Sequence, residues 1–284
     1  MRDFSSSTQA LALNTATLGH NVPGKGFGWS TEALIDNCAE LGFSGITFWR
    51  QEFSQHQNLD SVGRAVRGAG MSVSGLCRSP FFCGPFAPDV QQVKDDFKLA
   101  IDQTAELQAE CLVILTGGVP TGMKGITAGW GLIESILAEA AEYAAQSGVK
   151  LALEPLHPMY GGDRSCIVTV KDALTICENV GAQNLGIAVD VYHVWWDSQL
   201  EASLKGTDKV FSFHLCDWLA ETKDLLLDRG MMGDGVADIP EIRRIVEDVA
   251  GYQGLCEIEI FSEYWWSQPP RKVLETCVER FKGC

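Results

Sequence analysis

The sequence predicts one α/β domain, a single (β/α)8 TIM barrel that spans residues 1–284. Short apolar runs alternate with amphipathic segments along the chain, which is the pattern of parallel strands joined by right-handed crossover helices. Eight such pairs can be traced, whereas a doubly wound sheet has about five to seven strands. No G-x-G-x-x-G sequence follows a strand and opens a helix, so a dinucleotide-binding fold is not expected.

Each expected element can be placed on the sequence. The strands lie, in chain order, at 9–15, 44–49, 71–77, 111–117, 149–154, 185–190, 209–214 and 255–261. The first helix begins after the N-cap Ser30 and ends at Gly42, because serine caps free backbone N–H groups and glycine adopts the left-handed conformation that ends a helix. The other helices are expected at 62–70, 90–107, 132–148, 170–180, 198–205, 239–250 and 271–282.

The loops indicate which end of the barrel is functional. Those after the first, third, fourth, fifth and seventh expected strands are long and rich in glycine, proline and aromatic residues, as at 79–86. The turns at the opposite end are short, as at 69–70 and 147–148. Because the loops that follow the strands build the active site in such barrels, we expect the site at the carboxyl ends of the strands.

Composition and charge exclude several classes of function. A net charge of −15 argues against nucleic acid as the main partner, because that affinity depends on Lys and Arg neutralising phosphates. No apolar stretch approaches the roughly 20 residues that span a membrane, and the N-terminus lacks a signal-peptide core, so we expect a cytoplasmic protein. The ten cysteines contain no C-x-x-C pair, and we expect reduced core residues.

Four successive expected strands end in residues of the type that bind metals. They are Glu154, Asp190, His214 and Glu259. Burying a lone carboxylate at such a position costs on the order of several kcal/mol. Because parallel strands bring their ends to one place, the four side chains predict a common divalent metal site. The alternative is a salt-bridge cluster at the barrel mouth, but few cationic residues lie in these strands to complete it.

Three carboxylates and one imidazole form a mostly oxygen ligand set. This set favours one Mn²⁺ ion, with Mg²⁺, Co²⁺ or Zn²⁺ as alternatives, over the sulfur-rich ligation of structural zinc. An octahedral ion would keep open positions for a hydroxy-carbonyl compound. The metal would then stabilise the enediolate that forms when a neighbouring C–H proton is removed.

The motifs around these residues resemble those of a known superfamily. They are Leu-Glu-Pro-Leu-His-Pro (153–158), Val-Asp-Val-Tyr-His (189–193), Phe-His-Leu-Cys-Asp (213–217), Gly-Asp-Gly (233–235) and Ile-Glu-Ile-Phe (258–261). Their combination is similar to the xylose-isomerase-like TIM-barrel superfamily, and within it to the sugar phosphate isomerase/epimerase branch. The similarity runs over nearly the whole chain, with the specific motifs in the last four strands.

The resemblance implies roles for individual residues. Glu154 and Glu259 would bind the metal and, as in the epimerase members, exchange the proton of the substrate. Asp190 and His214 would complete the metal sphere. His193 matches a position that contacts a substrate hydroxyl in those members.

Other candidates follow from their positions in the loops. His157, three residues after Glu154, is a candidate general acid or base, the alternative being a loop histidine held by the backbone. We predict substrate contact for Arg229, whereas Arg164 could hold an anionic or polyol substrate or brace its loop through a carboxylate. His193 and Arg229 are expected to orient the substrate without binding metal.

Tryptophans crowd the same end of the barrel. Six of the eight follow expected strands, namely Trp49, Trp195, Trp196, Trp218, Trp265 and Trp266. We predict that Trp49 and Trp218 contact the substrate, since an indole ring can stack on a sugar face. A subunit interface is the alternative, because tryptophan is enriched there. The number of rings points to a substrate larger than a triose or tetrose.

The leading functional prediction is a metal-dependent isomerase or epimerase acting on a sugar or polyol as its small-molecule carbohydrate substrate. The runner-up is a lyase that removes the same proton and then expels a leaving group, as in inosose dehydratase or the catalytic subunit that cleaves 3-oxo C-glycosides. His157 supports the lyase, because elimination needs a separate acid. A homo-oligomer is expected, with a small partner subunit in the case of a C-glycoside-cleaving lyase.

Two other classes fit less well. The apurinic endonuclease that shares this barrel needs many more histidines than the five present, and its substrate would meet an acidic protein. A non-catalytic binding subunit would not need an intact set of four metal ligands.

Overall fold

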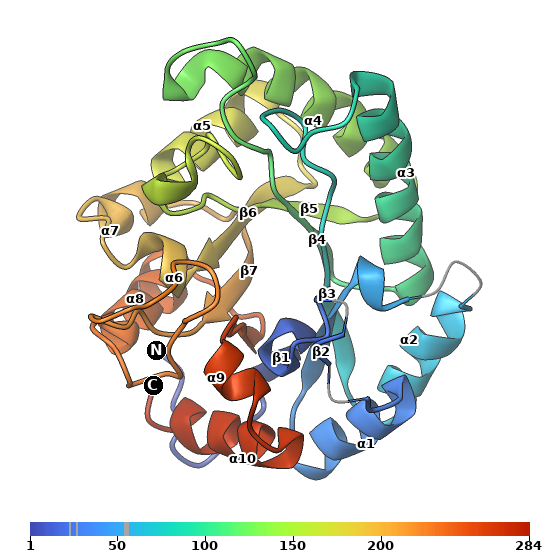
Figure 1. The fold of residues 1–284 in the computed structure, drawn as a ribbon, viewed down its shortest axis with the longest axis vertical. Coiled ribbons are helices and arrows are strands. Elements are labelled where there is room, and N and C mark those ends of the chain that lie inside the picture. The colour runs from blue at the N-terminus through green and yellow to red at the C-terminus, as the bar shows by residue number, and fades with distance from the viewer. Residues whose placement is uncertain (23, 27, 54–56) are drawn as a thin grey trace.

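A closed barrel of eight parallel strands forms the centre of the molecule. The computed structural model describes residues 1–22, 24–26, 28–53 and 57–284. The strands follow one another around the barrel in sequence order, and the last pairs with the first. The α-helices surround the barrel on the outside (Figure 1). The predicted (β/α)8 TIM barrel is therefore confirmed.

The elements have the following bounds. The strands are β1 (Leu11–Asn14), β2 (Gly45–Trp49), β3 (Ser72–Cys77), β4 (Cys111–Ile114), β5 (Lys150–Leu153), β6 (Leu185–Asp190), β7 (Val210–Leu215) and β8 (Cys256–Ile258). The α-helices are α1 (Thr31–Glu40), α2 (Leu59–Gly68), α3 (Val90–Leu107), α4 (Trp130–Ala145), α5 (Val170–Val180), α6 (Val191–Val194), α7 (Leu200–Leu204), α8 (Ile239–Arg244), α9 (Glu263–Trp266) and α10 (Pro270–Phe281). Short 3-10 turns occupy Thr15–Leu18, Arg50–Glu52, Ile126–Gly129 and Pro158–Tyr160, and a π-helical turn, Ile245–Val249, follows α8.

Several strands end earlier than the apolar pattern predicts, and the residues at their ends give the reason. Pro155 follows Glu154 and has no N–H to continue the ladder of β5. The side chain of Asn14 accepts a hydrogen bond from the backbone N–H of Ala16, which turns the chain out of β1. The predicted helix signals hold at α1, where Ser30 caps the first turn and Gly42 follows the last with φ of 80°.

The barrel interior is filled beneath the strand ends. Side chains two residues apart on a strand point to the same face. The residues two positions before the predicted ligands are therefore interior too, and they are Ala152, Ala188, Ser212 and Glu257. Ala152 and Ala188 pack with Cys111 in a buried cluster. This closes the barrel below and leaves the carboxyl ends of the strands as its open end.

Two further expectations concern the chain as a whole. The cysteines are all free, and nine of the ten are buried, as predicted. Among the helices of the described residues, none combines the length and apolar character needed to cross a membrane.

Candidate metal centre and active site

The four predicted metal ligands meet at the carboxyl ends of β5 to β8. One ligand atom from each of Glu154, Asp190, His214 and Glu259 lies within 4.8 Å of the others. His214 Nδ1 is 3.2 Å from Glu154 Oε1 and 3.7 Å from Glu259 Oε2. All four residues are buried. The structure therefore brings together the residues that the strand-end pattern singles out.

Local structure at the end of β6 presents two of the predicted site residues on one face. Asp190 is paired with His214 in the sheet register and is the N-cap of α6, where its Oδ1 accepts a hydrogen bond of 2.8 Å from Tyr192 N. The helix that starts there carries His193 back to the same side, because residues three apart are neighbours on a helix. His193 Nε2 is 3.7 Å from Asp190 Oδ2.

Unsatisfied polar atoms at the centre of the cluster fit a cation. Glu154 Oε1 and His214 Nδ1 are buried and lie 3.2 Å apart, and apart from this contact neither has a hydrogen-bond partner among the described residues. Buried polar atoms are normally paired. A divalent ion between the four side chains would satisfy both atoms, and the carboxylate and imidazole donors suit Mn²⁺, Mg²⁺, Co²⁺ or Zn²⁺. The residues present therefore fit the metal that the sequence predicts.

A further carboxylate, that of Glu257, lies behind His214 and was not predicted from the sequence. Glu257 Oε2 is 3.5 Å from His214 Nε2, and Ser212 Oγ lies 3.0 Å from the same nitrogen and donates to Glu257 Oε1 over 3.1 Å. A carboxylate behind a ligand histidine fixes its tautomer and ring orientation and strengthens it as a donor. The sequence contains a signal for this residue, because Glu257 lies two positions before Glu259 and so shares its strand face.

Asn14 is the other residue that sequence reasoning missed. Its Nδ2 donates a hydrogen bond of 2.9 Å to Glu259 Oε1, and its Oδ1 accepts one of 2.8 Å from Trp49 Nε1. Asn14 stands at the end of the apolar run of β1, just as the predicted metal ligands stand at the ends of their strands. This position was the signal in the sequence that could have identified it. Trp49, predicted to contact substrate, therefore also helps to fix the orientation of Glu259.

Arg229 lies against the predicted ligands. Its Nη1 is 2.9 Å from Asp190 Oδ2 and 3.0 Å from Glu259 Oε2. Its guanidinium carbon lies 4.4 Å from the ring centroids of both Tyr192 and Phe261. Few cationic residues lie in these strands, but Arg229, which comes from the loop after β7, pairs with two of the three carboxylates.

The same loop explains the Gly-Asp-Gly motif. The carboxylate of Asp217 accepts hydrogen bonds from four backbone N–H groups, those of Trp218, Gly233, Gly235 and Ala237. A Cβ at Gly235 would lie 2.1 Å from the carbonyl oxygen of Trp218, so only glycine fits this close approach. Arg229 N donates to Phe261 O over 2.9 Å. These contacts hold the loop so that Arg229 reaches the metal ligands.

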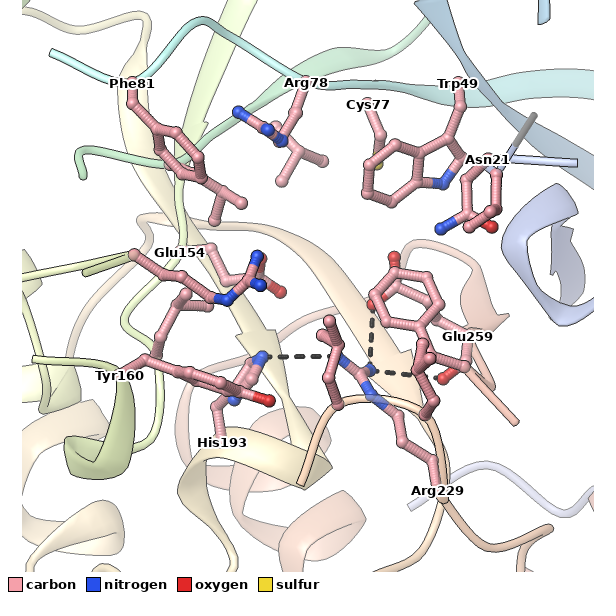
Figure 2. A pocket seen from close by; sticks show the side chains of 18 of the residues that line it. Asn21, Trp49, Cys77, Arg78, Phe81, Glu154, Tyr160, His193, Arg229 and Glu259 are labelled. Atoms are coloured by element: carbon pink, nitrogen blue, oxygen red, sulfur yellow. Dashed lines mark hydrogen bonds and ion pairs between the residues drawn. The ribbon is translucent and has the colours of Figure 1, made fainter. Parts of the chain in front are cut away.

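A cavity of about 210 Å³ adjoins the cluster, and Figure 2 shows Glu154 and Glu259 entering it from two sides. His193, Arg229 and Trp49 line it as well. This volume is below the roughly 300–1,000 Å³ of sites for drug-sized ligands. A monosaccharide-sized group fits it better than the larger substrate inferred from the number of tryptophans.

Two predicted residues are not among those that line the cavity. The imidazole of His157 stacks on the indole of Trp218, with ring centroids 5.0 Å apart, and its Nδ1 accepts a hydrogen bond from Met159 N. Of the six tryptophans at this end of the barrel, Trp49 is the one that lines the cavity. The geometry gives His157 and Trp218 a packing role, and their contact with substrate stays a prediction.

Burial sets the protonation of His193. It lowers the pKa of His193 to about 3, so the imidazole is neutral at pH 7. His193 Nδ1 accepts a hydrogen bond of 3.2 Å from the backbone N–H of His157. This bond assigns the proton to Nε2. Nε2 is 3.4 Å from Arg229 Nη2, and in this tautomer the two atoms are both donors and are not hydrogen-bonded to each other, because a guanidinium only donates. The His193 side chain can therefore present an N–H donor at the cavity.

In the absence of a cation, Glu259 and His214 hold protons at neutral pH, whereas the pKa of Asp190 is lowered, because Arg229 and the nearby histidines outweigh its burial. Burial raises the pKa of Glu259 to about 8, and the charges of Glu154 and Asp190 act in the same direction. Burial also raises the pKa of Glu154. Burial lowers the pKa of His214, but Glu257 and the other carboxylates outweigh it, so this pKa lies well above its ordinary value. The metal-free cluster is therefore a protonated one at neutral pH.

Comparison with known proteins agrees with this geometry. Residues 35–283 match the family model described as Xylose isomerase-like TIM barrel. The chain belongs to this family. It is similar to a fructoselysine 3-epimerase of Escherichia coli O157:H7, with 28% identity over 194 residues and 66% of each chain covered. It is also similar to an inosose isomerase of Halalkalibacterium halodurans, with 28% identity over 151 residues.

These matches leave part of each relative uncovered, since the chain spans 66% of the epimerase and 50% of the isomerase. A solved structure covers more. The crystal structure of protein SMc04130 from Sinorhizobium meliloti 1021 is 41% identical and aligns with a TM-score of 0.88 over 98% of this chain and 99% of that one. The family resemblance inferred from the motifs is confirmed.

The carboxylate behind His214 should strengthen metal binding. Replacing Glu257 with Gln removes the negative charge near His214 Nε2 but keeps the size, and we expect metal affinity to fall about 10- to 100-fold. Metal titration followed by elemental analysis measures this. Glu263→Gln, at an exposed glutamate of α9, is the matched control, and Asp190→Ala should lose the metal altogether. Unchanged affinity in folded Glu257→Gln protein would contradict the assignment.

Metal affinity should fall as the pH falls. Because the pKa of Glu259 is about 8 and that of His214 is also raised, an ion must displace protons at neutral pH. We expect affinity to drop at least about tenfold per pH unit below pH 8. Calorimetry with Mn²⁺ in buffers of different ionisation enthalpy counts the released protons. Affinity independent of pH, with no proton release, would exclude a protonated cluster.

Proposed function

We propose that this protein is a divalent-metal-dependent isomerase or epimerase that acts on a keto/hydroxy sugar or polyol. The observation that carries the proposal is that Glu154 and Glu259, two members of the ligand cluster, line one cavity with His193 and Arg229. Carboxylates placed on two sides of a substrate can remove a proton from carbon and return one. The epimerase and isomerase names of the relatives support the same chemistry.

Glu154, Asp190, His214 and Glu259 would hold the ion, which we propose to be Mn²⁺. When bound, it would supply Lewis-acid stabilisation of the negative charge that develops as the C–H proton leaves, giving an enediolate. One of the two glutamates takes the proton and the other delivers one to the product.

His193 and Arg229 orient the substrate in this proposal. Neutral His193 donates its Nε2–H to a substrate oxygen. Arg229 is held between the rings of Tyr192 and Phe261, and its buried Nε has no partner among the described residues. A fixed guanidinium positions hydroxyl or carbonyl oxygens at little cost in conformational entropy.

The alternative is a metal-dependent lyase, which needs an acid beside the leaving group. His157 was the candidate for that acid, but it packs on Trp218, and burial lowers its pKa, which disfavours the protonated form. The hydroxyl of Tyr160 donates to Leu225 O instead of pointing a free proton at the cavity. These contacts favour isomerisation or epimerisation. The cytoplasmic location and homo-oligomeric state remain predictions from the sequence.

Proton exchange in D₂O tests the proposed reaction. Metal-loaded protein is incubated with ketoses, inososes and 3-oxo-glycosides, and we expect deuterium at one carbon beside a carbonyl, detected by NMR. Glu154→Gln and Glu259→Gln should each slow exchange by at least about 100-fold, because general acid–base groups contribute that much. Asp190→Ala, without metal, is the inactive control. Absence of exchange in all three classes would count against the proposal.

The variant His157→Asn separates the two chemistries. For an isomerase or epimerase we expect turnover within about fivefold of wild type, because the glutamates carry the proton transfers. The measurement compares deuterium exchange with product formation. Loss of product with continued exchange would indicate a lyase in which His157 is the acid. Complete loss of both would make His157 the base and would overturn the role given to the glutamates.

A further inference from the structure

Two arginines line the cavity away from the metal ligands. Arg78 follows β3, and Arg164 lies in the loop after β5. Figure 2 shows Arg78 beside Phe81 on one side of the pocket, with Arg229 and His193 on the other. None of the four metal ligands is bonded to either guanidinium. These two side chains are therefore a separate feature of the same cavity.

Neither guanidinium has a well-placed carboxylate partner in the part of the chain that the structure describes. The one hydrogen bond from the guanidinium of Arg78 goes to Ser79 O, over 3.1 Å. The nearest carboxylate to Arg164 is that of Asp163, with Nε 3.8 Å from Oδ2, and the Arg164 side chain is 32% exposed. The five residues outside the description include no Asp or Glu.

Most other arginines of this acidic protein are paired with a carboxylate. Arg67 donates to Leu107 O instead, and carboxylate contacts are made by Arg2, Arg50, Arg64, Arg229, Arg243, Arg244, Arg271 and Arg280. With 37 acidic residues against 22 basic ones, an arginine in a cavity wall without such a contact is an exception. Burial lowers the pKa of Arg78 to about 10, and the charge of Arg164 acts in the same direction. Placing two such cations at one cavity costs free energy unless an anion offsets it.

We propose that Arg78 and Arg164 form a subsite for an anionic group, a carboxylate or a phosphate, carried by a part of the substrate that does not contact the metal ligands. This rests on the proposed function, since it assumes that the keto/hydroxy part of the substrate lies at Glu154 and Glu259. The planar guanidinium fork binds either kind of anion in a bidentate manner. The cavity volume of about 210 Å³ limits the compound to monosaccharide size.

Part of the cavity wall is apolar. Phe81, Leu115 and Leu156 are among the residues that line it, and the guanidinium of Arg78 lies 3.9 Å from the centroid of the Phe81 ring. Apolar surroundings strengthen a charge-assisted hydrogen bond to an anion. The arginine subsite would therefore discriminate between a substrate that ends in a charged group and one that ends in a hydroxyl.

The test uses three ketohexoses that differ at C6: D-fructose, D-fructuronate and D-fructose 6-phosphate. Their binding to Mn²⁺-loaded protein is measured at equilibrium by calorimetry, so the result does not depend on turnover. We expect the carboxylate or the phosphate compound to bind at least about tenfold more tightly than D-fructose, and the better of the two identifies the anion. Arg78→Met and Arg164→Met should each reduce this preference, with little change in D-fructose affinity.

Arg64→Met, at an exposed arginine of α2 paired with Asp60, is the matched control and should keep the preference. Arg164→Met removes a partly exposed side chain, so it tests the subsite even where Arg78→Met does not fold. Equal binding of the three compounds, or binding of none, would overturn the proposal. A preference that survives both substitutions would also overturn the proposal, because the anion would then be bound elsewhere, at the metal or at Arg229. Deuterium exchange in the same samples reports separately on the proposed reaction.

Discussion

Charge balance in a buried barrel mouth is the constraint on which this site depends. The buried carboxylates of the cluster are Glu154, Asp190, Glu257 and Glu259. Arg229 and His214 are the cationic or ionisable partners in contact with them. Uncompensated buried charge is costly, so the excess negative charge has to be neutralised. The raised pKa of Glu259 describes one solution, in which the cluster takes up protons, and a divalent ion would be the other.

The four predicted metal ligands differ in how many hydrogen bonds from other residues hold their side chains in place. Asp190 is held by Tyr192 N and Arg229, Glu259 by Asn14 and Arg229, and His214 by Ser212. Glu154 has no comparable support among the described residues, since its Oε1 is unpartnered apart from the nearby imidazole. Glu154 is therefore the ligand with the fewest fixed side-chain contacts among the described residues.

The sequence predicts the parts of the site that follow from strand geometry. Glu154, Asp190, His214 and Glu259 could be found because parallel strands of a barrel align their ends, whatever the side chains do afterwards. Glu257 and Asn14 obey the same geometry, but they support His214 and Glu259 instead of binding metal, so a pattern of strand-end ligands does not single them out. Loop residues are different, since no periodicity fixes the direction of their side chains. The His157 side chain packs on Trp218 and does not line the cavity, whereas that of Arg229 contacts the carboxylate of Asp190. Their directions depend on contacts such as the stacking on Trp218, which involve residues distant in sequence.

The two ends of the cavity have opposite character, and the net charge of −15 surrounds both. Long-range attraction cannot draw an anion to such a protein, and screening limits exposed charges to about 10 Å at ordinary salt. Selection of an anionic substrate would therefore depend on contacts made after entry, where Arg78 lies in an apolar wall with little competing hydrogen bonding. Recognition of this kind acts mainly on dissociation, because rim charges govern association whereas buried charged contacts govern release. A keto/hydroxy end at the carboxylate cluster and an anion at the arginines would fix both ends of the substrate, which is what a proton transfer between two fixed glutamates requires.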